Sequence, residues 1–172
     1  MAERKGLVTG GGGAPLTLVG DPVKAGDRAP SFTVRDNDLN PVGFDAFQGK
    51  TVIIAAVPSL DTPVCDLETR RFNREAAGLG PDVVILTISM DLPFAQKRWC
   101  GTAGVDKVTT LSDYYDASFG TAYGVLVKEL RLLARSVFVI DKNGTVRYAQ
   151  LVPALGQEPD YDAVLRAVKE LA

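Results

Sequence analysis

The sequence contains no histidine and only two cysteines, Cys65 and Cys100, among its 172 residues. A cysteine nucleophile of the protease type is activated by an imidazole base, so that class of hydrolase is excluded. A zinc site is disfavoured because two thiols 35 positions apart, without CxxC spacing, would need carboxylates to complete four ligands. We therefore expect neither a metal ion nor a cofactor.

Two further features are lacking, an excess of positive charge and a long apolar run. The 19 Lys and Arg residues are interspersed with 21 Asp and Glu residues, so no basic stripe predicts binding to nucleic acid. No segment has the length of a membrane span, and the N-terminal residues lack the apolar region of a signal peptide. These features predict a cytoplasmic protein with neither nucleic acid nor membrane as a partner. In that compartment cysteines are more often catalytic or reduced than joined in a structural disulfide.

The chain is otherwise composed like an ordinary globular protein, with 46% hydrophobic and 23% charged residues. Its length fits a single domain over residues 1–172. Residues 1–20 predict an N-terminal β-hairpin around a glycine-rich turn. This glycine run is not a phosphate-binding loop, because it lacks the GK[ST] ending and opens no helix.

The order of the predicted elements indicates the fold class. Apolar, β-branched runs at 51–57 and 83–89 predict buried parallel strands joined by a helix over 65–80. We expect further helices over 92–101, 116–122 and 158–172, with irregular chain after Gly124. The turn at 142–144 lies between two β-rich runs and predicts an antiparallel hairpin. Together these elements predict a thioredoxin-like three-layer α/β fold with an N-terminal β-hairpin.

The segment PSLDTPVC, residues 58–65, places one cysteine where the first of these strands gives way to a helix. Thr62 suits the N-cap and Pro63 the first helical position, so Cys65 faces the unpaired amides of the first turn. A helix N-terminus stabilises an anion by roughly 0.3–2 kcal/mol, which lowers a thiol pKa by only about one unit. A free cysteine has a pKa of about 8.5 and the thiolate is the nucleophile, so we expect a permanent cation beside Cys65.

Spacing alone does not choose the residue that supplies this cation. Four arginines are candidates: Arg70, Arg71, Arg131 and Arg135. Three acids lie near the start of the helix, and we interpret them as solvated residues that complement the helix dipole: Asp61, Asp66 and Glu68.

The motif Pro58-x-x-x-Thr62-x-x-Cys65 resembles the active-site motif of the peroxiredoxins, and PSLDTPVCDLETRRFN resembles their thiol peroxidase branch. The resemblance extends to DLPFAQKRWC, LLARSVFVID and LVPALGQEPDY and thus covers most of the chain. It implies that Cys65 is the peroxidatic cysteine and that Thr62 hydrogen-bonds to it and to the substrate oxygen. It also implies that Pro58 shields the site from water and that Arg135 holds the thiolate and the peroxide.

The resemblance further implies a function and its partners. Cys65 would reduce alkyl hydroperoxides and hydrogen peroxide, and its sulfenic acid would be resolved as an intrachain Cys65–Cys100 disulfide. Thioredoxin would then reduce this disulfide, and the working form would be a homodimer. Without the resemblance, Cys100 is interpreted as a buried small hydrophobic residue on the helix over 92–101. A disulfide requires close Cα atoms, so we expect local unwinding on oxidation, which Gly101 and Gly104 would ease.

Two interpretations stay open. The apolar residues around the motif, namely Pro58, Leu60, Val64 and Phe94, would favour alkyl hydroperoxides, although core packing explains them as well. The alternative function is a thioredoxin-like redox sensor or electron carrier without peroxidase turnover. A carrier would ordinarily have a second cysteine three positions after Cys65, and Glu68 occupies that position.

Overall fold

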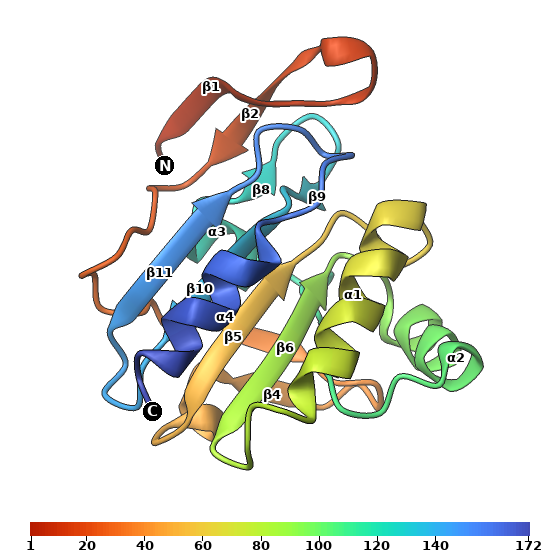
Figure 1. Cartoon of the computed structure of the whole chain (residues 1–172). Coiled ribbons are helices and arrows are strands. Elements are labelled where there is room, and N and C mark those ends of the chain that lie inside the picture. Colours follow the sequence, from red (N-terminus) through yellow and green to blue (C-terminus); the bar gives the residue numbers. More distant parts are fainter.

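The computed structural model describes residues 1–172, which form two sheets and four α-helices (Figure 1). The central sheet has the order β11-β10-β5-β6-β7-β3-β4, and its strands are β3 (Thr33–Arg35), β4 (Pro41–Gly43), β5 (Thr51–Ala56), β6 (Val83–Ser89), β7 (Thr109–Ser112), β10 (Ser136–Ile140) and β11 (Val146–Leu151). The smaller sheet has the order β1-β2-β8-β9, with β1 (Glu3–Thr9), β2 (Pro15–Val19), β8 (Leu126–Val127) and β9 (Leu132–Leu133). The helices are α1 (Pro63–Ala76), α2 (Pro93–Ala103), α3 (Ser118–Ala122) and α4 (Tyr161–Lys169), and two short 3-10 helices span Gly11–Gly13 and Phe44–Phe47.

The centre of the larger sheet consists of β5 between β6 and β10. β5 and β6 run parallel, as predicted, while β10 is antiparallel to both β5 and β11. Every residue of β5 is buried, because both faces of this strand are covered. Its side chains alternate between the faces, so Ile53 packs in one hydrophobic cluster and Ile54 in another.

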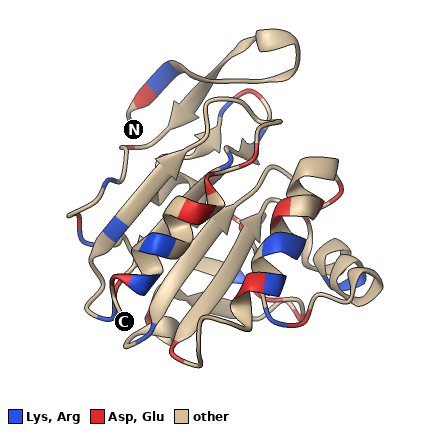
Figure 2. Cartoon of the chain, in the orientation of Figure 1, with Lys and Arg blue, Asp and Glu red and all other residues tan.

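The elements form three layers, which confirms the predicted fold class. α1 and α4 cover one face of the central sheet, where Phe72 and Val164 pack with Ile53 (Figure 1). α3 and the smaller sheet lie on the other face, where Phe119 and Leu18 belong to the larger cluster. Charged residues of both signs lie along α1 and α4, whereas β5 and β6 carry none (Figure 2).

The N-terminal hairpin is confirmed, and it is packed onto the domain. β1 and β2 pair antiparallel with a shift in register between Lys5 and Val8, and Val8 and Leu18 are fully buried. The expectation of irregular chain after Gly124 is wrong, because β8 and β9 follow there and extend the hairpin into a four-stranded sheet. Each of these strands has two residues, too few to produce a local sequence pattern, and β8 forms by pairing with a distant segment.

The helices lie close to their predicted positions. The C-cap of α2 is Gly104, which adopts the left-handed conformation with a φ of 67° that glycine adopts readily. No helix has both the length and the apolar character needed to cross a lipid bilayer.

Candidate active site

Cys65 occupies the third position of α1 and its side chain is completely buried. The sulfur lies in a small apolar cluster with Val57 and Leu60, and the Trp99 ring packs against this cluster. Thr62 is the N-cap, as predicted, but its side chain makes no capping hydrogen bond. Its hydroxyl instead donates to the Ser59 carbonyl oxygen at 2.8 Å.

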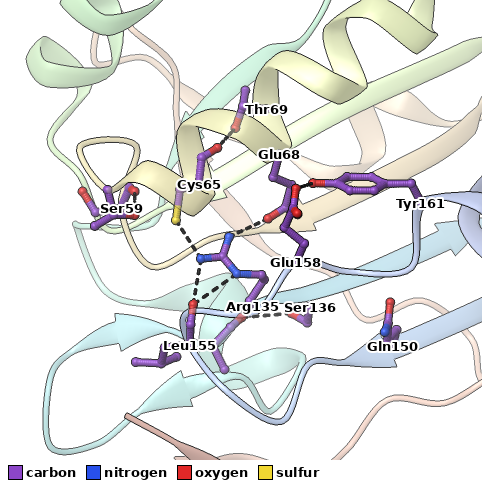
Figure 3. Close-up of polar contacts among 12 residues, drawn as sticks. Ser59, Cys65, Glu68, Thr69, Arg135, Ser136, Gln150, Leu155, Glu158 and Tyr161 are labelled. Atoms are coloured by element: carbon purple, nitrogen blue, oxygen red, sulfur yellow. Dashed lines mark hydrogen bonds and ion pairs between the residues drawn. The ribbon is translucent and has the colours of Figure 1, made fainter. Parts of the chain in front are cut away.

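The guanidinium of Arg135 meets this sulfur from the chain that joins β9 to β10. Nη2 donates to the Cys65 Sγ at 3.2 Å, and Nη1 donates to Glu68 Oε2 at 2.6 Å. Nε and Nη2 also donate to the Leu155 carbonyl oxygen, at 3.2 and 2.8 Å (Figure 3). All three nitrogens are therefore engaged, and the side chain is only 1% exposed. Of the four candidate arginines, Arg135 is thus the one whose guanidinium contacts the Cys65 sulfur.

The other candidate arginines point elsewhere. Arg70 forms an ion pair with Asp66 at 2.9 Å, and Arg71 forms one with Glu75 at 3.0 Å. Arg131 is exposed and has a positive φ of 54°. Asp66 accepts hydrogen bonds at the half-exposed surface, so the interpretation of a solvated acid is close to correct there.

Glu68 is different, and its interpretation as a solvated residue is wrong. Its side chain has no exposed surface, and its Oε1 has no hydrogen-bond partner. Burial raises the pKa of this carboxyl to about 7, although the charge and the hydrogen bond of Arg135 oppose the shift. One signal was available in the sequence: Glu68 lies three residues after Cys65, so both side chains share a face of α1.

Cys100 lies on α2 and is partly buried, and both cysteines are free thiols. Its Sγ is 3.4 Å from Thr110 Oγ1, on β7. Its neighbour Trp99 connects α2 to α1, because the indole Nε1 donates a hydrogen bond to Asp66 Oδ1 at 3.0 Å. The two cysteines therefore have separate partners, with Trp99 packed against the cluster that contains Cys65.

The motif, the buried arginine and the fold agree with comparisons to known proteins. The family model for redoxins matches residues 24–165. The chain belongs to the redoxin family. This redoxin is 58% identical to the thiol peroxidase of Bacillus subtilis, over 92% of this chain and 95% of that protein, and 53% identical to the thiol peroxidase of Staphylococcus saprophyticus, over 91% and 94%. A solved peroxiredoxin-like protein from Aquifex aeolicus is 45% identical, with a TM-score of 0.89 and 98% of each chain covered. The redoxin thus falls in the thiol peroxidase branch of the peroxiredoxins, as its motifs indicate.

Asp91 of this redoxin organises the loop before Cys65, a role that was not predicted from the sequence. Its Oδ1 accepts from the Ser59 hydroxyl at 2.6 Å, and its Oδ2 accepts from the Leu60 amide at 2.8 Å. The Ser89 hydroxyl donates to the same Oδ2 at 2.7 Å. Asp91 follows β6, whose carboxyl end lies beside that of the parallel strand β5, and this placement was a usable signal.

The apolar residues around the motif divide into two groups. Pro58 and Leu60 belong to the loop before α1 and are buried, whereas Phe94, at the start of α2, is 65% exposed. Val64 is half-buried. A shallow hollow opens at the start of α1 and is lined by Leu60, Asp61, Thr62, Pro63, Asp66 and Trp99. In this redoxin a small molecule can thus approach the N-terminus of α1 beside the cluster that holds the sulfur.

Proposed function

We propose that this protein is a thiol-dependent peroxidase in which Cys65 attacks the hydroperoxide. The observation that carries the proposal is the contact between Arg135 Nη2 and the Cys65 sulfur at 3.2 Å, in a site with no imidazole. A guanidinium remains charged at any physiological pH and favours an anionic sulfur. The helix N-terminus acts in the same direction. The thiolate is the form that attacks a peroxide oxygen.

The first half of the reaction consumes one hydroperoxide. The Cys65 thiolate forms a bond to the distal oxygen while the O–O bond breaks, and the sulfur gives up two electrons. The leaving alkoxide takes up one proton, so the products are a sulfenic acid and an alcohol, or water when the substrate is hydrogen peroxide. In this proposal Pro58 excludes water from the sulfur and Thr62 contacts the substrate oxygen. Arg135 holds both the sulfur and the peroxide.

The second half regenerates the thiol. The Cys100 thiol condenses with the Cys65 sulfenic acid, which releases water and forms an intrachain disulfide. A dithiol such as that of thioredoxin then reduces the disulfide by thiol–disulfide exchange. The apolar residues beside the site, including the exposed Phe94, support alkyl hydroperoxides as the preferred substrates. The homodimer remains a prediction from the family resemblance, and the cytoplasmic location remains a prediction from the sequence features.

Peroxide consumption coupled to thioredoxin oxidation tests this proposal. The wild type is expected to turn over repeatedly, and Cys65→Ser is expected to be inactive. Cys100→Ser is expected to react once with peroxide and then stop. A redox sensor would show that single reaction in the wild type as well, and full turnover by Cys65→Ser would rule out Cys65 as the attacking group.

A further inference from the structure

The active site contains two buried acids and one buried cation. Cys65 and Glu68 are both completely buried, and both side chains are bound by the same guanidinium of Arg135 (Figure 3). One positive charge can neutralise one anion at a time. If the thiol and the carboxyl were both ionised, the cluster would carry a net negative charge in a region shielded from water, which is costly.

The groups around Glu68 do not supply a second cation. The Glu158 carboxylate raises the pKa of Glu68 further, and the Tyr161 hydroxyl donates to that carboxylate at 2.8 Å. Burial raises the pKa of Tyr161, so this phenol stays neutral in the physiological range. Arg71 lies over the Tyr161 ring, 4.7 Å from its centroid, and pairs with Glu75. Arg135 is the cation that acts on Glu68.

We propose that Glu68 is a positioning residue that competes with Cys65 for the charge of Arg135, so that the two acids share one proton near neutral pH. This inference deepens the proposed function and rests on it. Ionised Glu68 fixes the guanidinium but draws on the charge that the thiolate needs. Protonated Glu68 leaves that charge to the sulfur. The pKa of about 7 for Glu68 agrees with this sharing. The unpartnered Oε1 also agrees, because a buried carboxyl oxygen without a hydrogen bond costs less free energy when the group is neutral than when it is ionised.

Sharing of one proton between Cys65 and Glu68 changes the proton balance of the peroxide reaction. The thiolate becomes a neutral sulfenic acid, so Arg135 loses its anionic partner and Glu68 can ionise in its place. The balanced change is that the Cys65 thiolate, the Glu68 carboxylic acid and ROOH give the sulfenic acid, the Glu68 carboxylate and ROH. The O–O bond breaks, an S–O bond forms, and the proton lost by Glu68 equals the proton gained by the alkoxide. Near neutral pH the net uptake of protons from solvent is therefore less than one per Cys65 oxidised.

The matched variants are Glu68→Gln and Glu75→Gln. Both remove one acid from α1, but Glu75 is partly exposed and pairs with Arg71. In Glu68→Gln the amide oxygen of the new side chain can still accept a hydrogen bond from Arg135, so the geometry is retained. The measurement is the rate of Cys65 oxidation by a hydroperoxide between pH 5 and 9, followed by rapid quenching and mass spectrometry. We expect Glu68→Gln to shift the acidic limb of this profile to lower pH and to react several-fold faster than wild type at pH 6. Glu75→Gln should keep the wild-type profile.

A second measurement uses the wild type and does not depend on folding of a variant. Proton uptake per Cys65 oxidised, followed with a pH indicator in weak buffer, should be below one at pH 7 and should approach one at pH 9, where Glu68 is already ionised. Glu68→Gln should take up close to one proton at both pH values.

Several outcomes would overturn the sharing of the proton. They are an unshifted profile in Glu68→Gln, a uniform loss of rate with the shape unchanged, or a wild-type uptake of one proton at pH 7. A wild type that does not react with hydroperoxides at all would instead defeat the proposed function, so the two failures are distinguishable.

Discussion

Arg135 illustrates why a guanidinium suits this site better than an ammonium would. Its three nitrogens donate to three different acceptors, the Cys65 sulfur, the Glu68 carboxylate and the Leu155 carbonyl. The planar fork holds these acceptors in one arrangement, whereas a lysine is a flexible point charge. The Leu155 carbonyl belongs to the chain that follows β11, so Arg135 also connects the site to the C-terminal segment.

The substitution Arg135→Lys should therefore retain the positive charge but lose the planar fork that binds three acceptors. A hydrogen bond to a charged group contributes about 1.5–3 kcal/mol, so we expect the rate constant for Cys65 oxidation to fall about 10- to 100-fold. Quenched-flow oxidation with a hydroperoxide measures this rate. Arg74→Lys, an exposed change on α1, serves as the control and should react like wild type. Equal rates for Arg135→Lys and wild type would contradict the assigned role.

Glu68 should also affect the stability of the protein as pH changes. Its pKa is about 7 in the folded chain, above the ordinary value of 4.5, so the folded state binds the proton more tightly. The protonated Glu68 carboxyl thus contributes to the free energy of unfolding below pH 4.5, and this contribution is lost as pH rises through about 7. We expect the free energy of unfolding of wild type, relative to Glu68→Gln, to fall by about 1–3 kcal/mol between pH 4.5 and 8. Urea unfolding at both pH values measures this, and a difference that stays constant with pH would contradict it.

The individual site residues were predictable to different degrees. Cys65 followed from the junction of strand and helix, because a proline and an N-cap residue precede it. The need for a cation also followed, but the choice of Arg135 required the family resemblance, since contacts across 70 residues leave no local pattern. Glu68 was misinterpreted because acids near the start of a helix are usually solvated. The Leu155 carbonyl is a backbone group, so no residue type marks it.

At the level of helices and strands, periodicity succeeded where elements were long. The strands β5 and β6 begin at the residues predicted, because continuous β-branched runs mark strands buried on both faces. β8 and β9 were missed because they are defined by their partners in the smaller sheet. Local sequence patterns also could not predict that the N-terminal hairpin packs onto the domain, because its contacts are distant in the sequence.

The helix α2 should rearrange when the two cysteines join. Cys65 faces Arg135 and Cys100 faces Thr110, so both sulfurs must leave their partners to form a disulfide. Trp99 adjoins Cys100, and the hydrogen bond from the Trp99 indole to Asp66 holds α2 against α1. We expect the fluorescence of this sole tryptophan to change when peroxide oxidises the wild type. Cys100→Ser, which can form only the sulfenic acid, should show little change, and identical spectra for oxidised and reduced wild type would contradict the rearrangement.

For the molecule as a whole, the question is whether the N-terminal hairpin folds with the rest. Leu18 lies on β2 but packs in the same cluster as Ile54 of the central sheet and Phe119 of α3. A hairpin alone is marginally stable in water, so its order depends on this packing. The hairpin should therefore belong to one cooperative unit that spans residues 1–172.

Leu18→Ala tests this cooperativity. Removing a fully buried leucine side chain costs about 2–5 kcal/mol, and in a single unit the whole protein should lose that stability. Urea unfolding followed by far-ultraviolet circular dichroism and by Trp99 fluorescence should shift to one lower midpoint with both probes. Leu7→Ala, in the same hairpin but 49% exposed, should change stability by less than about 0.5 kcal/mol. If Leu18→Ala left the midpoint seen by Trp99 unchanged, the hairpin would be a separate unit, because Trp99 packs on the opposite face of the central sheet from Leu18.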